Sequence, residues 1–110
     1  MEIIETKKND ITVLALKGRL DTLSSTSLEN KLLDIINNNV LNVIIDFSQL
    51  DFISSSGLRV LLTAGKQVKT KQGMLVLCSL KEHVKEVFDV AGFTMLFKMY
   101  ASLDEAIQKL

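Results

Sequence analysis

Apolar residues change their spacing several times along the chain, and each change indicates a new strand or helix. Residues 11–16 are mostly apolar and begin with β-branched side chains, which is typical of a strand, and Gly18 is expected to end it. Residues 2–6 form a weaker strand candidate, joined to the first by a polar turn over residues 7–10. The chain is therefore expected to begin with two strands.

From Ser25 onward the spacing of the apolar residues becomes helical. Those that fall on one face of the predicted helix are Leu28, Leu32, Leu33, Ile35 and Ile36. Thr26 and Glu29 have the spacing of a capping box near its start, although Ser24 or Ser25 could be the N-cap instead. The three asparagines at 37–39 are expected to end the helix.

Two later segments, residues 43–47 and 74–78, are apolar without alternation, as expected of strands buried on both faces. Between them, the apolar positions from Leu58 to Val68 predict a second helix, which Gly73 is expected to stop. The middle of the chain is therefore predicted to run strand, helix, strand.

The last part of the chain is predicted to hold two more helices and a short strand. Ser79 and Glu82 have the spacing of a capping box for a third helix that ends at Gly92. Residues 96–100 then form a last strand, and Ser102, with a glutamate three residues later, caps a closing helix. Strands and helices that alternate in this way predict one α/β domain with parallel, right-handed crossovers.

The charge balance and the rare residue types exclude several classes of function. Thirteen basic side chains balance thirteen acidic ones, so no net field attracts nucleic acid or anionic lipid. With one cysteine and one histidine, the chain has no internal disulfide and no His-rich metal site. No apolar run reaches the roughly 18–20 residues of a membrane span, and the acidic N-terminus is unlike a signal peptide. We expect a cytoplasmic protein without metal.

Isolated residues of possible chemical interest have simple structural interpretations. Cys78, at the end of a buried strand, is interpreted as a small core side chain, and His83 as an exposed helix residue. Lys66, Lys69 and Lys71 are interpreted as a solvated face whose charges suit the end of the second helix, with a partner-binding patch as the alternative.

The motifs of common α/β enzymes are missing. Gly65 and Lys66 do not complete a phosphate-binding loop, because Gln67 follows them. Neither Ser55 nor Ser56 has the glycine two residues earlier that a nucleophile elbow requires. An enzyme with one of these serines as nucleophile is a weak third hypothesis, since no base or oxyanion partner is visible. We therefore expect a protein that is not an enzyme and has no cofactor.

Three consecutive serines, Ser54, Ser55 and Ser56, precede Gly57 where a predicted buried strand gives way to a helix. Serine is a preferred N-cap residue, so one of the three is expected to cap the helix. A helix N-terminus also stabilises an added phosphate through its N–H groups and its dipole. A phosphate there would make a neutral docking surface dianionic.

The chain resembles the STAS domain of the stand-alone anti-sigma-factor antagonist type. The matching segments occur in order over nearly the whole chain, at residues 18–21, 43–47, 52–58, 75–78 and 84–93. The most specific of them is the serine-glycine-leucine piece after a buried strand. The resemblance implies a single STAS-like domain over residues 1–110, an α/β fold with a mixed sheet of four to five strands flanked by about four helices.

The resemblance also implies regulation by partner switching. In that family the unmodified antagonist binds an anti-sigma factor that is also a serine kinase of the histidine-kinase-like ATPase fold, and so frees the sigma factor. Phosphorylation breaks this complex, and a PPM-type phosphatase restores it. The phosphoacceptor falls on Ser56, with Ser55 as the alternative. Asp21, Ser54, Ser55, Ser56 and Gly57 are implied to lie at the partner-binding surface.

The chain departs from the family pattern at one position of this segment. Ser54 stands where many regulated members have aspartate two residues before the phosphoserine. The missing aspartate would have placed a like charge beside the phosphate and would also have been a determinant of kinase recognition. Its absence therefore has two opposite effects on phosphorylation of the segment. The alternative hypothesis is a STAS binding module without phosphorylation, a scaffold or a small-ligand or lipid-transport accessory.

Overall fold

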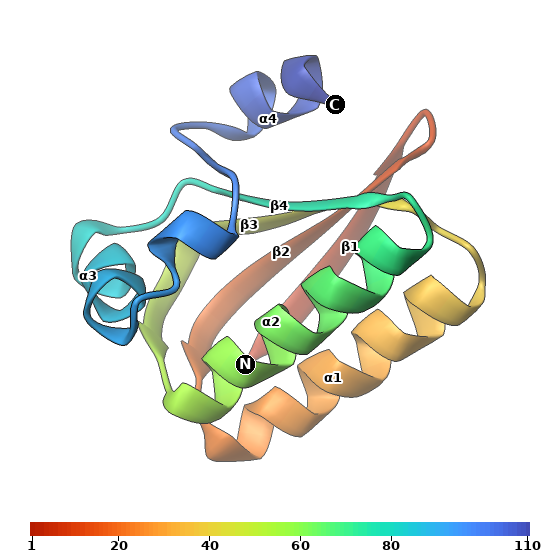
Figure 1. The fold of residues 1–110 in the computed structure, drawn as a ribbon. Coiled ribbons are helices and arrows are strands. Elements are labelled where there is room, and N and C mark those ends of the chain that lie inside the picture. The colour runs from red at the N-terminus through yellow and green to blue at the C-terminus, as the bar shows by residue number, and fades with distance from the viewer.

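Five strands in the computed structural model, which describes residues 1–110, form one mixed sheet with the order β1-β2-β3-β4-β5 (Figure 1). β1 is antiparallel to β2, and every other neighbouring pair is parallel. In chain order the elements are β1 (Glu2–Lys8), β2 (Ile11–Leu20), α1 (Thr22–Asn37), β3 (Asn42–Ile53), α2 (Ser55–Thr70), β4 (Met74–Cys78), α3 (Glu82–Ala91), the 3-10 helix η1 (Thr94–Leu96), β5 (Met99–Tyr100) and α4 (Leu103–Lys109). The predicted α/β class and mixed sheet are confirmed.

The helices cover the two faces of the sheet unequally. α1, α2 and α3 lie on one face, and the short α4 lies on the other (Figure 1). The larger core, of 19 buried residues, lies under the three helices, whereas the core beneath α4 has six. One fully buried row of the larger core, Leu14, Ile45 and Leu77, crosses the three central strands in register. The neighbouring residues Ile44 and Val76 belong to the core on the other face, so burial on both faces explains the uninterrupted apolar runs of β3 and β4.

The two strands that lead to the candidate site are longer than expected. β2 does not end at Gly18 but continues to Leu20, with a shift of register between Gly18 and Arg19. Gly18 has a φ of 107°, which a residue with a side chain rarely adopts, so the glycine permits a bend within the strand. β3 likewise continues past Phe47 to Ile53. Both strands therefore reach the same end of the sheet.

Several predicted helix ends are wrong. α1 begins at Thr22, so neither the Thr26 capping box nor Ser24 or Ser25 supplies its N-cap, which is Asp21. The start of α3 has Lys81 at the N-cap without a side-chain bond. Ser79, expected to cap it, lies outside the helix.

Other ends agree with the sequence more closely. Asn38 caps the C-terminus of α1, and Gly92, with a φ of 76°, ends α3. The Ser102 hydroxyl accepts a hydrogen bond from the N–H of Glu105 at 3.1 Å. α2 ends at Thr70, three residues before the expected stop. The last strand is shorter than predicted, because Leu96 ends η1 and pairing with β4 begins only at Met99.

Candidate functional site

Two helix N-termini meet at one end of the sheet, because β2 and β3 are parallel and each leads directly into a helix. Leu20 and Ile53, the last residues of these strands, are in register. The Ser54 N–H donates a hydrogen bond to the Leu20 carbonyl at 2.8 Å. α1 and α2 therefore start side by side (Figure 1), with Asp21 and Ser54 as their N-caps.

The three serines at the start of α2 have different surroundings. Ser54 is the N-cap, and its hydroxyl oxygen accepts a hydrogen bond from the Gly57 N–H at 3.2 Å. Ser55 is exposed in the first turn, and Ser56 is half-buried. The Ser56 hydroxyl lies 3.4 Å from that of Thr22, in the first turn of α1. Only Ser56 of the three thus joins the two helices through its side chain.

Asp21 is fixed by reciprocal hydrogen bonds with Ser24. Its Oδ1 accepts from the Ser24 N–H and from the Ser24 hydroxyl, both at 3.0 Å. In return, the Asp21 N–H donates to the Ser24 hydroxyl oxygen at 2.9 Å. These hydrogen bonds, the one from the backbone N–H above all, lower the pKa of Asp21. A carboxylate is therefore held in place beside the serine segment.

Further residues join this end of the molecule that the sequence did not single out. The Arg19 guanidinium lies 4.2 Å from the centre of the Phe52 ring. This cation–π contact joins the paired residues near the ends of β2 and β3. Leu23, in the first turn of α1, is 88% exposed. No sequence motif marks the Arg19–Phe52 contact or the exposure of Leu23. The only signal in the sequence is that these residues lie close to Asp21 and Ser54 along the chain.

The loop before α3 is attached to the end of β3. Asp51 and Lys81 form an ion pair, which lowers the pKa of the Asp51 carboxyl. His83 is exposed on α3, as expected, and its Nε2 donates a hydrogen bond to the Asp51 carbonyl at 2.7 Å. This hydrogen bond attaches α3 to the end of β3, and His83 forms no hydrogen bond with a serine.

A comparison with protein families identifies the chain. The sequence model of the STAS domain family matches residues 2–106. The chain belongs to the STAS domain family. The resemblance seen in the sequence is thereby confirmed.

Individual STAS proteins agree with this membership. BtrV of Bordetella bronchiseptica, which carries the name of an anti-sigma factor antagonist, is 37% identical over 106 residues, covering 96% of this chain and 91% of BtrV. The structure of TM1081 of Thermotoga maritima superposes with a TM-score of 0.92 at 19% identity, over 97% of this chain and 92% of that one. Unphosphorylated SpoIIAA of Bacillus gives 0.86 at 24% identity, over 98% and 95% of the two chains. These two structures share the STAS fold.

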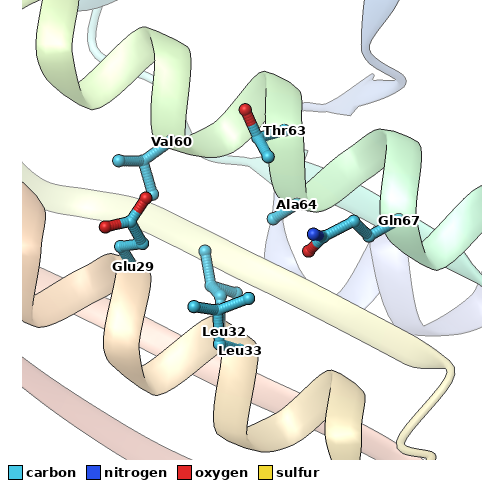
Figure 2. A pocket seen from close by; sticks show the side chains of 7 residues that line it. All are labelled: Glu29, Leu32, Leu33, Val60, Thr63, Ala64 and Gln67. Atoms are coloured by element: carbon cyan, nitrogen blue, oxygen red, sulfur yellow. The ribbon is translucent and has the colours of Figure 1, made fainter.

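The STAS domain has a polar hollow beside Ser56, between α1 and α2. Its polar side chains are Ser25, Thr26, Glu29, Ser56, Arg59 and Thr63. Farther along the same two helices, a narrower hollow has Glu29 and Leu32 of α1 opposite Val60 and Ala64 of α2 (Figure 2). This second hollow has a volume of about 20 Å³, against about 220 Å³ for the hollow beside Ser56. Between α1 and α2, the more open and polar hollow is therefore the one nearer the helix N-termini.

The residues at this end of the STAS domain are of the kinds that can bind another protein and accept a charged modification. No cluster of three or more His, Cys, Asp or Glu side chains could hold a metal ion. No helix is long and apolar enough to cross a membrane. Hydroxyls of both helix N-termini and one fixed carboxylate lie at this end of the sheet, and the exposed Leu23 belongs to the same first turn of α1 as Thr22. Such a surface can dock a protein and can change its charge at a hydroxyl.

Proposed function

We propose that this STAS protein is an anti-sigma-factor antagonist that acts in the cytoplasm by partner switching. The unphosphorylated form binds an anti-sigma factor that is also a serine kinase of the histidine-kinase-like ATPase fold, and so frees the sigma factor. Phosphorylation at Ser56 breaks the complex, and a PPM-type phosphatase reverses it. The names of BtrV and of the anti-sigma-B factor antagonist of Bacillus subtilis, which is 27% identical, support this role.

The observation that carries the proposal is the position of Ser56 between the two helix N-termini. Its hydroxyl lies 3.4 Å from that of Thr22, so a phosphate on Ser56 would face both helices. The first N–H groups of a helix have no partner within it and can donate to the phosphate oxygens. The modification would thus be held without unfolding the domain. The structures of SpoIIAA in unphosphorylated and phosphorylated forms add support.

The proposed step transfers the γ-phosphoryl group of ATP to the Ser56 hydroxyl oxygen. The kinase accepts the hydroxyl proton, and ADP leaves. The modified residue carries roughly two negative charges near neutral pH. The fixed Asp21 carboxylate immediately precedes Thr22, which contacts Ser56, so the local charge becomes strongly negative where the partner docked. The added charge must then be desolvated for rebinding, which weakens the complex.

The proposed partner surface extends from Ser56 over the start of α1. Asp21 supplies charge, while the exposed Leu23 supplies apolar area that a partner can cover. Gly57 is buried and keeps the first turn of α2 against the sheet. Ser54 contributes as the N-cap, a role that aspartate also fills. The serine at this position therefore preserves the helix start while removing a charge from the surface.

Phosphopeptide mapping tests the proposal. The purified protein is incubated with ATP and a lysate of its source cells, in parallel with the Ser56→Ala and Ser55→Ala variants and with a positive-control substrate. We expect phosphate on Ser56 that disappears only in Ser56→Ala. Phosphate on Ser55 would keep the mechanism and move the switch by one residue. No phosphate on any of the three serines, with the control modified, would contradict the proposal.

A binding comparison then tests the switch itself. Ser56→Asp should weaken binding to the purified kinase by at least about tenfold, because it adds a charge at the centre of the docked surface. Ser55→Asp is the matched control, since it adds the same charge on the exposed neighbour. Unchanged affinity of Ser56→Asp, with a native circular dichroism spectrum, would count against the switch.

One observation favours a second candidate, a STAS binding module that is never phosphorylated. Ser54 caps α2 through its own hydroxyl, so the serine segment has a structural role without any modification. Such a module would act as a scaffold or as a small-ligand or lipid-transport accessory. A stable complex that contains no kinase, together with absence of phosphate in the mapping experiment, would favour it.

A further inference from the structure

β4 has a free edge along its first half. β5 pairs with β4 only at Leu77 and Cys78, so no strand lies beside Met74, Leu75 and Val76 on that side. The Leu77 N–H points to this side and donates a hydrogen bond to the Lys98 carbonyl at 2.9 Å. The Met74 N–H points to the opposite side, toward β3, and donates to the Leu41 carbonyl at 2.7 Å. Since backbone groups alternate along a strand, Leu75 directs its N–H and carbonyl toward the free edge.

A groove runs along this free edge. α2 forms one wall and the segment from Leu96 to Lys98 forms the other. Its apolar lining includes Leu62, Met74, Leu75, Val76, Leu96 and Phe97. Gly65 belongs to the α2 wall, where a Cβ would meet nothing nearer than Phe97 at 3.7 Å. The missing side chain therefore keeps the groove open next to the exposed backbone of β4.

The charges around the groove have one sign. Lys66 and Lys69 of α2 and Lys98 before β5 all line it, and no acidic side chain does. None of these three lysines takes part in an ion pair. The chain as a whole carries no net charge, so this grouping is a local feature. A second copy of the same edge would bring three more lysines and be repelled, whereas an acidic segment would be attracted.

We propose that this groove binds an extended acidic segment of a partner protein, which pairs with β4 at Leu75. The backbone of the segment would hydrogen-bond to the Leu75 N–H and carbonyl, as in the addition of a strand to a sheet edge. Alternate apolar side chains would enter the groove, and carboxylates would face Lys66, Lys69 and Lys98.

This docking surface is separate from the serine segment. Lys66 follows Ser56 by ten residues on α2, which corresponds to about 15 Å along the helix axis. The proposal consequently does not depend on the anti-sigma role. A protein held at the β4 edge can remain bound whether or not a partner occupies the helix N-termini.

Amide hydrogen exchange followed by NMR tests the backbone pairing. The probe is a capped seven-residue peptide of alternating glutamate and valine, and a lysine–valine peptide of the same length is the control. In the free protein the Leu75 amide should exchange quickly. The acidic peptide should slow it by at least about tenfold, while Val76, whose N–H faces β3, should change little. An already protected Leu75 amide in the free protein would overturn the proposal.

Charge reversal tests the lysines. The triple variant Lys66→Glu, Lys69→Glu and Lys98→Glu should bind the acidic peptide at least about tenfold more weakly. The matched control reverses three other exposed lysines, at 8, 17 and 85, and should bind within about twofold of the wild type, since these lie outside the groove. Equal binding by both triple variants would contradict the proposal. Dodecanoate, a fatty acid, tests whether the groove binds a lipid. If dodecanoate bound without protecting the Leu75 amide and the acidic peptide did not bind, the proposal would also be contradicted.

Discussion

Gly57 rests directly on Leu20, so that the first turn of α2 touches the last residue of β2. A Cβ atom added at Gly57 would lie 2.7 Å from Leu20 Cγ and 3.1 Å from Ile53 Cγ1. Leu20 is fully buried and cannot turn away. The absence of a side chain at Gly57 thus sets how closely the serine segment approaches the sheet and α1.

The Gly57→Ala variant should be less stable than the wild type. Alanine improves helix propensity by about 1 kcal/mol, but overpacking a buried site costs about 1–3 kcal/mol. Because the contacts fall on two core side chains, we expect a net loss of about 1–2 kcal/mol in the free energy of unfolding. Urea denaturation followed by circular dichroism measures this loss.

Gly65→Ala is the matched control on the same helix. Its Cβ would meet only Phe97, at 3.7 Å, an ordinary contact. This variant should therefore gain about 0.5–1 kcal/mol of stability from helix propensity alone. If both alanine variants were stabilised equally, the close packing of Gly57 on Leu20 would be refuted.

The central strands β2, β3 and β4 were predictable from the sequence because their burial leaves a continuous apolar signal. The row formed by Leu14, Ile45 and Leu77 is an example, since each lies in an apolar run that no helical pattern fits. Leu33, by contrast, was placed on the buried face of α1 and is exposed. The helical pattern alone could not decide its position, because that depends on where α2 packs.

The start of α1 could not be found from local spacing alone. Between residues 22 and 27 nearly every side chain carries a hydroxyl. Serine and threonine are both preferred at the N-cap, so local sequence offers several equivalent starts for the helix. The choice of Asp21 follows from the length of β2, which continues to Leu20 because it pairs with β3 as far as Ile53. Strand pairing, a long-range effect, thus decides the cap.

The sequence correctly placed the three serines between a buried strand and a helix, but it did not predict the contacts around them. The contact of Arg19 with Phe52 and the ion pair of Asp51 with Lys81 each join residues at least thirty positions apart. No short motif encodes such contacts. They arise because the ends of β2 and β3 lie together and α3 packs beside them.

Alanine substitutions should separate the capping serine from its neighbours. Ser54→Ala removes the acceptor of the Gly57 N–H and should cost about 1 kcal/mol of stability, as is usual for a lost N-cap. Ser55→Ala, at an exposed position without such a bond, should change stability by less than about 0.5 kcal/mol. Thermal and urea unfolding of both variants measure the difference. A larger loss for Ser55→Ala would show that the cap is assigned to the wrong serine.

The Asp21 carboxyl should titrate below its ordinary pKa of 3.8 in the folded protein, because the Ser24 N–H and hydroxyl donate to its charged form. Folding then favours the ionised carboxylate. Its contribution to stability is present above pH 3.8 and is lost as the pH falls through the lower folded pKa. The carbon chemical shift of the carboxyl, followed by NMR from pH 6 downward, reports the value directly.

Ser24→Ala is the variant that tests the cause of this shift. It removes the hydroxyl donor but keeps the backbone N–H, which makes the larger contribution to the low pKa. The pKa of Asp21 should therefore rise part of the way toward 3.8 and not reach it. An unchanged pKa in this variant would mean that the hydroxyl hydrogen bond does not form in solution.

The Cys78 thiol should be unreactive in the folded protein. Burial above all, and then the charge of Asp46, raise its pKa from 9.0 to about 11, and the side chain is fully buried. At pH 8 only about one thiol in a thousand would be ionised, and the thiolate is the reactive form. Labelling by a thiol-specific disulfide reagent at pH 8 should thus be slow in buffer and fast in denaturing urea.

The same shift predicts a loss of stability in alkali. Because folding raises the pKa of Cys78, its protonated thiol favours the folded state fully below pH 9.0, and this preference is lost as the pH rises toward about 11. Cys78→Ala should therefore show a smaller loss of stability than the wild type between these pH values, measured by urea denaturation. Fast labelling of the native wild type at pH 8, or an identical alkaline loss in Cys78→Ala, would show that the thiol is not held in the core as the structure has it.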